Sequence, residues 1–163
     1  MTDNRFEELF SQGTLHLHRG RADEATTLLE RAVALQPEHV DATINLSGAY
    51  ILNGKFKKAL ALLEPLSEQE PDNPMVWTNL GAAYLGNPVL ARDGEQLQAI
   101  SAFQRALEIR PAAPSVAYNL GLIYRDRNED EQAIRWFRQA LEDNPNDRHA
   151  RLMLDKLSPA DGP

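Results

Sequence analysis

The chain has 163 residues and a formal net charge of −7, so nucleic acid and anionic membrane surfaces, which are also negative, are disfavoured as partners. It contains no cysteine, which excludes disulfides, thiolate metal sites and a cysteine nucleophile. The N-terminus is polar and no apolar run approaches the ~18 residues that span a bilayer. We therefore expect a cytoplasmic protein without a membrane association.

Two residue types recur along the chain with a common period of 34 residues, interrupted once by an interval of 40. The prolines of this series are Pro37, Pro71, Pro111 and Pro145, and the alanines are Ala25, Ala59, Ala99 and Ala133. Because independent residue types share the same intervals, the chain consists of four repeated units. The six additional residues lie inside the third unit, between Tyr84 and Ala99.

The third unit carries the most complete motif, in which a Trp, a Leu, a Gly and a Tyr occupy one face of a helix. An Ala, a Phe and a Pro follow in the second half of the unit. These residues are Trp77, Leu80, Gly81, Tyr84, Ala99, Phe103 and Pro111. Their order, W-x2-L-G-x2-Y, then A-x3-F, then P, resembles the tetratricopeptide repeat (TPR).

The resemblance implies an all-α fold, a TPR-type α-solenoid. Four helix-turn-helix repeats and a C-terminal capping helix would form a right-handed superhelix, because one hairpin cannot bury its apolar face alone. We expect residues 1–158 to form a single domain and residues 158–163 a disordered tail. The expected repeats span about 6–39, 40–73, 74–113 and 114–147, and the capping helix spans 147–157.

The first unit matches the motif least well. Its helices are expected at residues 4–18 and 22–35, with Thr2 or Asp3 capping the first helix. We expect Phe6 and Leu9 to be exposed at the incomplete end of the array. Their exposure leaves open a structural role, in which copies of the chain associate weakly through the repeat ends or the groove.

The insertion in the third unit is expected to form a longer loop, 87–93, and about one additional helical turn. Asp93 and Gln96 have the spacing of a capping box, which places the start of the next helix near Gly94. Val89 and Leu90 are apolar residues within this loop. We expect them to pack back onto the hairpin, with contact to a partner as the alternative.

The final helix, 147–157, has an amphipathic pattern. Its apolar residues Ala150, Met153, Leu154 and Leu157 share one face, which is expected to cover the end of the fourth unit. The sequence contains no Gly-rich phosphate loop after a strand, no H-E-x-x-H motif and no nucleophile elbow. We therefore expect a protein that is not an enzyme and that has no cofactor or metal site.

In TPR proteins the first helices of the units line a concave groove, and the resemblance places the candidate site there. Asn45, Asn79 and Asn119 each precede the Leu position of the motif, and resemble the asparagine ladder of some TPR superhelices. An amide can pair with a peptide backbone through both its donor and its acceptor atoms. The alternative is that these amides only make local structural hydrogen bonds.

The remaining predicted groove residues are small, apolar or aromatic. They are Phe10, Thr14, Ile44, Thr78, Ala82, Tyr118 and Leu122. Such a surface suits a peptide with apolar side chains, whereas the Lys and Arg clamp of heat-shock co-chaperones is incomplete here. The sequence therefore predicts a scaffold that binds a peptide segment of a partner protein, with Tyr118 and Ile44 supplying apolar contacts.

Overall fold

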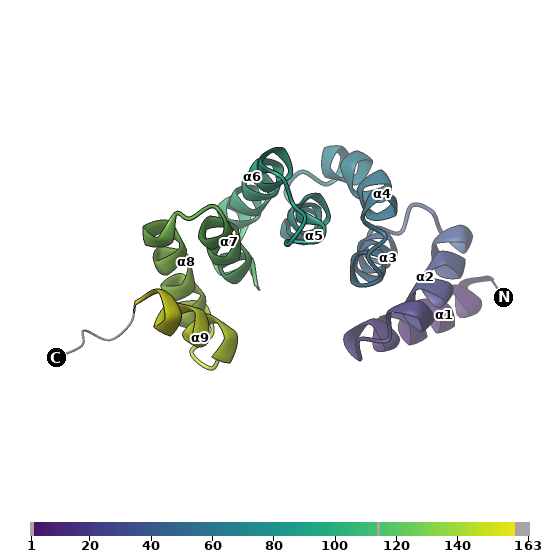
Figure 1. Cartoon of the computed structure of the whole chain (residues 1–163). Coiled ribbons are helices and arrows are strands. Elements are labelled where there is room, and N and C mark those ends of the chain that lie inside the picture. The colour runs from purple at the N-terminus through teal and green to yellow at the C-terminus, as the bar shows by residue number, and fades with distance from the viewer. Residues whose placement is uncertain (1, 114, 159–163) are drawn as a thin grey trace.

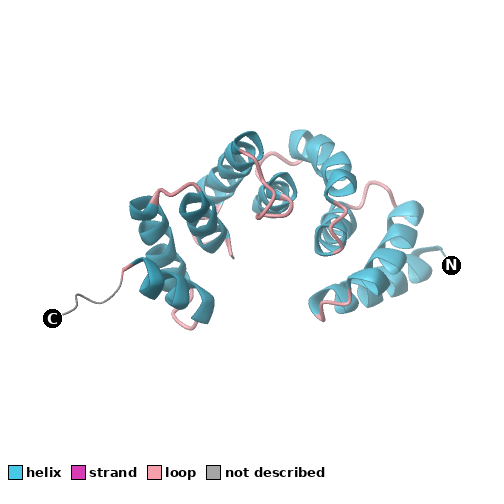
Figure 2. Cartoon of the chain, viewed as in Figure 1, coloured by secondary structure: helices cyan, strands magenta, loops and turns pink. Residues whose placement is uncertain are grey.

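The computed structural model describes residues 2–113 and 115–158. Within these ranges the secondary structure comprises nine α-helices and no β-strand (Figure 2), as the repeat predicts. The helices are α1 (Thr2–His18), α2 (Ala22–Leu35), α3 (Val40–Leu52), α4 (Phe56–Gln69), α5 (Pro74–Leu85), α6 (Asp93–Ile109), α7 (Val116–Asp126), α8 (Asp130–Asp143) and α9 (Arg148–Leu157).

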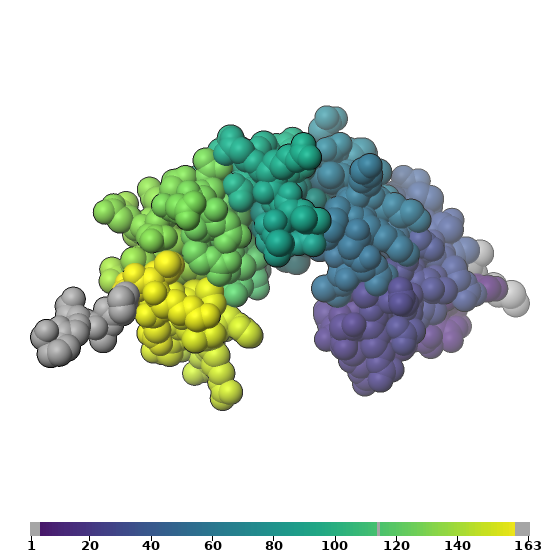
Figure 3. Space-filling view, in the orientation of Figure 1, coloured from purple at the N-terminus to yellow at the C-terminus, as the bar shows by residue number. Residues whose placement is uncertain are grey.

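The helices pair into four consecutive hairpins, and α9 follows as a single helix (Figure 1). The hairpins stack into an arch in which α3, α5 and α7 lie on the inner side and α4, α6 and α8 on the outer side. The two ends of the arch stand on either side of a hollow (Figure 3). This arrangement is the α-solenoid that the sequence predicts.

Each second helix ends two residues before the proline of its unit, at Leu35, Gln69, Ile109 and Asp143. Proline disfavours the helical conformation in the residue that precedes it, so the repeated proline sets the length of the second helix. Within three hairpins, the turn contains a residue with left-handed backbone geometry, where Gly and Asn are favoured. These residues are Gly20, Gly54 and Asn128, with φ values of 70°, 68° and 60°.

The glycine of the motif allows the two helices of a hairpin to approach each other closely. A Cβ atom added to Gly81 would lie 2.5 Å from the ring of Phe103, and one added to Gly121 would lie 2.6 Å from the ring of Phe137. Both rings are fully buried. Ser47 takes the glycine position in the second unit and is also fully buried. The close helix contact predicted from the motif is therefore present.

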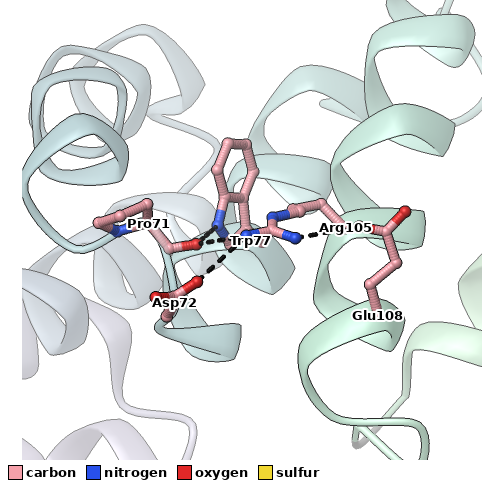
Figure 4. A network of polar contacts seen from close by, with 5 residues as sticks. All are labelled: Pro71, Asp72, Trp77, Arg105 and Glu108. Carbon is pink, nitrogen blue, oxygen red and sulfur yellow. Dashed lines mark hydrogen bonds and ion pairs between the residues drawn. The ribbon is translucent and has the colours of Figure 1, made fainter.

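Trp77 and Arg105 fix the junction between the second and third hairpins (Figure 4). The indole Nε1–H of Trp77 donates a hydrogen bond to the carbonyl oxygen of Pro71 at 2.9 Å. Arg105 Nη2 donates to the same oxygen at 3.3 Å and to Asp72 Oδ1 at 3.2 Å. Its Nη1 donates to Glu108 Oε2 at 3.0 Å. The tryptophan of the motif thus links one repeat to the next.

The final helix docks in the way that the first helix of a further repeat would. Arg151 Nη2 donates to the carbonyl oxygen of Pro145 at 3.3 Å, which repeats the six-residue relation between Trp77 and Pro71. Asp147 caps the helix by accepting hydrogen bonds from the backbone of residues 149 and 150, both at 3.0 Å. The predicted apolar face packs against α7 and α8, through Ala150, Met153, Leu154 and Leu157.

Two expectations concern side chains or residues outside the described part of the chain. Helix α1 begins at Thr2, two residues earlier than predicted, but the cap expected from Thr2 or Asp3 involves side chains that the structure does not describe. The disordered tail expected at 158–163 lies outside the described residues except for Ser158, which is the C-cap of α9.

Phe6 and Leu9 of the first hairpin are buried, with exposed fractions of only 1% and 7%. The expectation that they are exposed is therefore wrong. The ring centroid of Phe6 lies 5.6 Å from that of Phe10 and 4.7 Å from that of His39. Because His39 is the N-cap of α3, the second hairpin closes over this end of α1. These two side chains therefore offer no exposed surface through which copies of the chain could associate.

The insertion forms the loop 86–92 and the first turn of α6, but the capping residues differ from those predicted. Arg92 is the N-cap, and its backbone N–H donates to Glu95 Oε2 at 2.6 Å. Asp93 instead forms an ion pair with Arg127 at the end of α7. Gln96 is buried and accepts a hydrogen bond from the same guanidinium at 3.3 Å. The additional helical turn therefore connects the third hairpin with the fourth.

The two large apolar residues of the insertion do not pack back onto the hairpin, which is a second correction. Val89 and Leu90 are 89% and 74% exposed. The loop approaches α4 at its beginning, where a Cβ atom added to Gly86 would lie 3.5 Å from the Phe56 ring. Val89 and Leu90 follow this anchor at the surface, whereas Ala91 packs against the core of the third hairpin.

Tyrosine–glutamate hydrogen bonds connect successive hairpins. Tyr50 Oη donates to Glu30 Oε1 at 2.7 Å, and Tyr84 Oη donates to Glu64 Oε1 at 3.1 Å. Burial, and secondarily the hydrogen bond and charge of Glu30, raise the pKa of Tyr50 to about 12. Burial and the contact with Glu64 likewise raise the pKa of Tyr84. In both cases a phenolate would be desolvated and would be repelled by the neighbouring carboxylate.

We expect the free energy of unfolding to decrease between about pH 10 and pH 12, and to decrease less in a Tyr50→Phe variant. In this window the unfolded tyrosine, with a pKa of ~10, loses its proton while the folded Tyr50 keeps it. The unfolded state then binds fewer protons, so stability present below pH 10 is lost as the pH rises. Urea unfolding at pH 9 and pH 11 measures the difference. Equal losses in the variant and the wild type would contradict this role of Tyr50.

Candidate peptide-binding groove

The three predicted ladder asparagines occupy equivalent positions on α3, α5 and α7, the helices that line the inner side of the arch (Figure 1). All three side chains are half-buried. The insertion lies after α5, so it does not displace Asn119 from the position on its helix that corresponds to Asn45 and Asn79. The spacing of the motif therefore places the three amides on successive inner helices.

Two of the amides bind the first helix of the preceding hairpin through their Nδ2 atoms. Asn45 Nδ2 donates to Thr14 Oγ1 at 2.9 Å, which joins two of the predicted groove residues. Asn79 Nδ2 lies 3.2 Å from the carbonyl oxygen of Ile44 and 3.0 Å from Ser47 Oγ, both acceptors on α3. No donor in the described part of the chain reaches Oδ1 of Asn45 or of Asn79. The two amides stabilise the stacking of the repeats and keep their acceptor atoms available.

Asn119 differs from the other two asparagines. Its side chain makes no hydrogen bond with any residue that the structure describes, and the reason lies in the preceding unit. The position of Ser47, whose hydroxyl accepts from Asn79, is occupied in the third unit by Gly81, which has no side-chain acceptor. The Asn119 amide therefore retains both its donor and its acceptor capacity within the described structure.

Ile44 and Tyr118 were predicted to supply apolar contacts to a ligand. Ile44 is only 5% exposed and belongs to a core cluster that extends from the first to the third hairpin, so its side chain offers little surface to a peptide. Tyr118 is half-buried, with its ring centroid 5.8 Å from that of Phe137 and 6.5 Å from that of His149. Tyr118 therefore lies at the end of the groove next to α9.

The other predicted groove residues are all half-buried. Phe10 lies beside His39, with 5.1 Å between the ring centroids. Thr78 Oγ1 donates to the carbonyl oxygen of Pro74 at 2.9 Å, a bond within its own helix. Ala82 and Leu122 contribute to the edges of two neighbouring core clusters. These side chains could form shallow apolar walls, and their role in binding remains a prediction.

We expect an Asn79→Ala variant to lose about 1 kcal/mol of unfolding free energy, because its donor contacts with α3 disappear. Asn119→Ala is the matched control, since no side-chain hydrogen bond to a described residue is removed, and its stability should change by less than about 0.5 kcal/mol. Urea unfolding of both variants provides the comparison. Equal losses would show that the two amides have the same structural role.

The sequence motif identifies the asparagine positions but not their contacts with the previous helix. The motif does not indicate that the Ser47 hydroxyl is a partner of Asn79, although Ser47 stands at the glycine position of the repeat. Beyond the inner groove, no sequence pattern indicated the depression between α4, the insertion loop and α6, because its walls come from three separate segments.

The stacked hairpins, with small residues at the helix contacts and polar residues along the inner helices, define an α-solenoid repeat protein. Two tetratricopeptide repeat family models match the chain, one over residues 16–83 and the other over residues 88–148, and the chain therefore belongs to the tetratricopeptide repeat family. This fold is that of a protein-interaction scaffold, in a family that is generally non-catalytic. No helix in the described ranges combines the length and hydropathy needed to cross a membrane.

Comparison with known proteins gives relatives of the same fold. TTC0263, a thermophilic TPR protein in Thermus thermophilus, has a TM-score of 0.83 and 25% identity, with 96% of this chain and 83% of that chain covered. A mutant of MamA has a TM-score of 0.71 and 26% identity, with 98% and 89% covered.

A shorter sequence match is found with the Photosystem I assembly protein Ycf3 of Synechococcus sp. (strain CC9605), which is 39% identical over 57 residues. The match covers 31% of this chain and 33% of that protein. The similarity to this relative therefore spans about a third of its length.

Proposed function

We propose that the chain is a non-enzymatic adaptor that binds an extended peptide segment of a partner protein along the inner helices α3, α5 and α7. The observation that carries the proposal is the state of the three asparagines. The acceptor atoms of Asn45 and Asn79, and the whole amide of Asn119, have no partner among the described residues. A peptide backbone supplies the donors and acceptors that such a row can bind whatever the side chains of the peptide.

The asparagines act together with apolar surface in this proposal. Each neutral hydrogen bond contributes only ~0.5–1.5 kcal/mol, so the row alone gives modest affinity. Side-chain selectivity would arise near Tyr118 and Leu122, which are half-buried at the C-terminal part of the groove. We therefore place the most specific contacts on α7, where Asn119 is also free of side-chain hydrogen bonds to described residues.

The relatives support a role of this kind at a coarse level. Ycf3 is named as an assembly protein, and holding a segment of another protein is a physical task that suits such a role. For this chain we propose the task and leave the partner to be identified by experiment. Association of copies of this chain with one another is the competing outcome.

Photo-crosslinking in cells tests the proposal. A photoreactive phenylalanine at Leu122 on the inner side is compared with one at Gln132, an exposed residue of the outer helix α8. We expect an adduct with a second protein from position 122 and none from position 132. Adding Asn119→Ala should reduce the yield of that adduct while the melting temperature stays unchanged.

Two results would overturn the proposal. Equal adducts from positions 122 and 132, or none from either, would exclude selective binding by the inner helices. An adduct whose mass corresponds to two copies of this chain would replace the adaptor with a self-assembly module. The Asn119→Ala comparison separates ligand contact from damage to the fold, because the stability of that variant is measured independently.

A further inference from the structure

A second depression lies away from the inner groove, between α4, the C-terminal end of α5, the insertion loop and α6. We call it the insertion groove. Its volume is about 570 Å³, within the range of about 300–1,000 Å³ that is usual for ligand pockets. Its apolar lining comes mainly from Phe56 and Leu60 on α4, Tyr84 and Leu85 on α5, and Leu90 and Ala91 in the insertion.

The insertion gives this groove an exposed apolar rim. Leu90, which lines the groove, is 74% exposed, and its neighbour Val89 is 89% exposed. They are the two most exposed large apolar side chains in the described residues. The loop that carries them is anchored at its base, where Gly86 meets the Phe56 ring. An apolar pair held beside an apolar groove is a surface that a partner side chain can cover.

The charge distribution distinguishes one end of the groove. Lys57 lines it and forms no ion pair with a described residue. The two lining carboxylates already accept hydrogen bonds, Glu64 from the Tyr84 hydroxyl at 3.1 Å and Glu95 from the Arg92 backbone at 2.6 Å. Both carboxylates keep their negative charge, but Glu64 lies about 10 Å further along α4 than Lys57, two helical turns away. The positive charge of the lining therefore lies at the end of the groove where α4 begins.

The first turn of α4 adds to this positive charge. Helices α2, α6 and α8 each have acidic residues in the first turn, whereas α4 has none. Three of the four lysines in the chain lie here, at Lys55, Lys57 and Lys58, next to the positive end of the helix dipole. In a chain with a net charge of −7, this end of α4 attracts negative groups.

We infer that the insertion groove binds an acidic, apolar segment of a partner protein, distinct from the peptide proposed for the inner helices. A large apolar side chain of this segment enters between Leu60 and Leu90. A neighbouring Asp or Glu lies near Lys57 at the start of α4. The occupant is thus defined by charge complementarity at one end and by apolar contact along the insertion, and the chain is an adaptor with two separate surfaces.

Selection from a random library of displayed 12-residue peptides tests this inference on the purified full chain. The combined variant Lys57→Glu, Val89→Ser and Leu90→Ser is added in excess as a soluble competitor, so only peptides that require these side chains are retained. We expect the retained peptides to be enriched in Asp or Glu beside Leu, Ile, Phe or Trp. One such peptide is then synthesised with a fluorophore for affinity measurements by anisotropy.

The three substitutions change exposed side chains, and α9 offers matched controls for the measurements. Lys57→Glu and Leu90→Ser should each weaken binding of the peptide by about tenfold or more, because each removes one part of the recognition. Lys156→Glu and Leu152→Ser make the same chemical changes on exposed residues of α9, and should alter the affinity by less than about twofold. Asn119→Ala should also leave it unchanged.

Several results would overturn the inference. One is that the competitor removes all of the binding peptides, so that none requires the side chains of the groove. Another is that the retained peptides lack acidic residues. A third is that the control substitutions in α9 weaken binding as strongly as the substitutions in the groove. Sedimentation equilibrium at two protein concentrations tests whether a second copy of this chain occupies the groove. A dimer that is lost in Leu90→Ser and kept in Leu152→Ser would assign the groove to a second copy of this chain instead.

Discussion

Replacing Gly81 by leucine should lower the free energy of unfolding by about 3 kcal/mol, at the upper end of the range usual for overpacked cores. A Cβ atom at this position would lie 2.5 Å from two atoms of the Phe103 ring, closer than two carbon atoms can approach. The ring is fully buried, and the close packing of protein interiors leaves such a ring little space to move. The helices α5 and α6 would have to separate, which disrupts the hairpin at the centre of the arch.

A second glycine in the same hairpin provides a control, because replacing it should increase the free energy of unfolding. Gly94 lies in the first turn of α6, and no heavy atom lies within 4 Å of the position of an added Cβ atom. Gly94→Ala should therefore raise the free energy of unfolding by about 0.5–1 kcal/mol, since it reduces the freedom of the unfolded chain. Thermal and urea unfolding measure both variants. A Gly81→Leu variant as stable as the wild type would show that the assigned helix contact is wrong.

The contacts that could be predicted from the sequence are those within one repeat. Gly81 and Phe103 stand at fixed positions of a single unit, and the same pair recurs as Gly121 and Phe137. A recurring pair of this kind indicates a contact even without coordinates. The helix ends were predictable for a related reason, because proline restricts its own neighbours and needs no distant partner.

The contacts that could not be predicted are those between units or at places where the period is broken. Phe6 was expected to be exposed, but His39 of the next hairpin covers it. For Asn79 both ligand contact and local hydrogen bonds are expected, but the particular partner of its Nδ2 is Ser47, a residue that replaces glycine in the second unit alone. The insertion has no counterpart in the other units, so nothing in the repeat indicated where Leu90 would point.

Deleting residues 148–157 should lower the free energy of unfolding by about 3 kcal/mol and cause the protein to associate. Helix α9 covers the last hairpin with Ala150, which is fully buried, and with the half-buried Met153, Leu154 and Leu157. Burial of one large aliphatic side chain contributes about 1.5–3 kcal/mol when complete, so three half-buried ones give a sum of this size. The uncovered apolar face of α7 and α8 would favour aggregation, as at any uncapped end of a repeat array.

Point substitutions in α9 distinguish the effect of its packed face from the effect of helix formation alone. Leu154→Lys places a charge on the face that packs against the fourth hairpin, whereas Leu152→Lys changes a side chain that is 49% exposed. Leucine and lysine have similar helix propensities, so the two variants differ mainly in what the side chain touches. We expect Leu154→Lys to lower the melting temperature and increase light scattering, and Leu152→Lys to do neither. If both variants behave alike, or if the deleted chain stays monomeric with an unchanged melting temperature, α9 does not stabilise the array by covering its end.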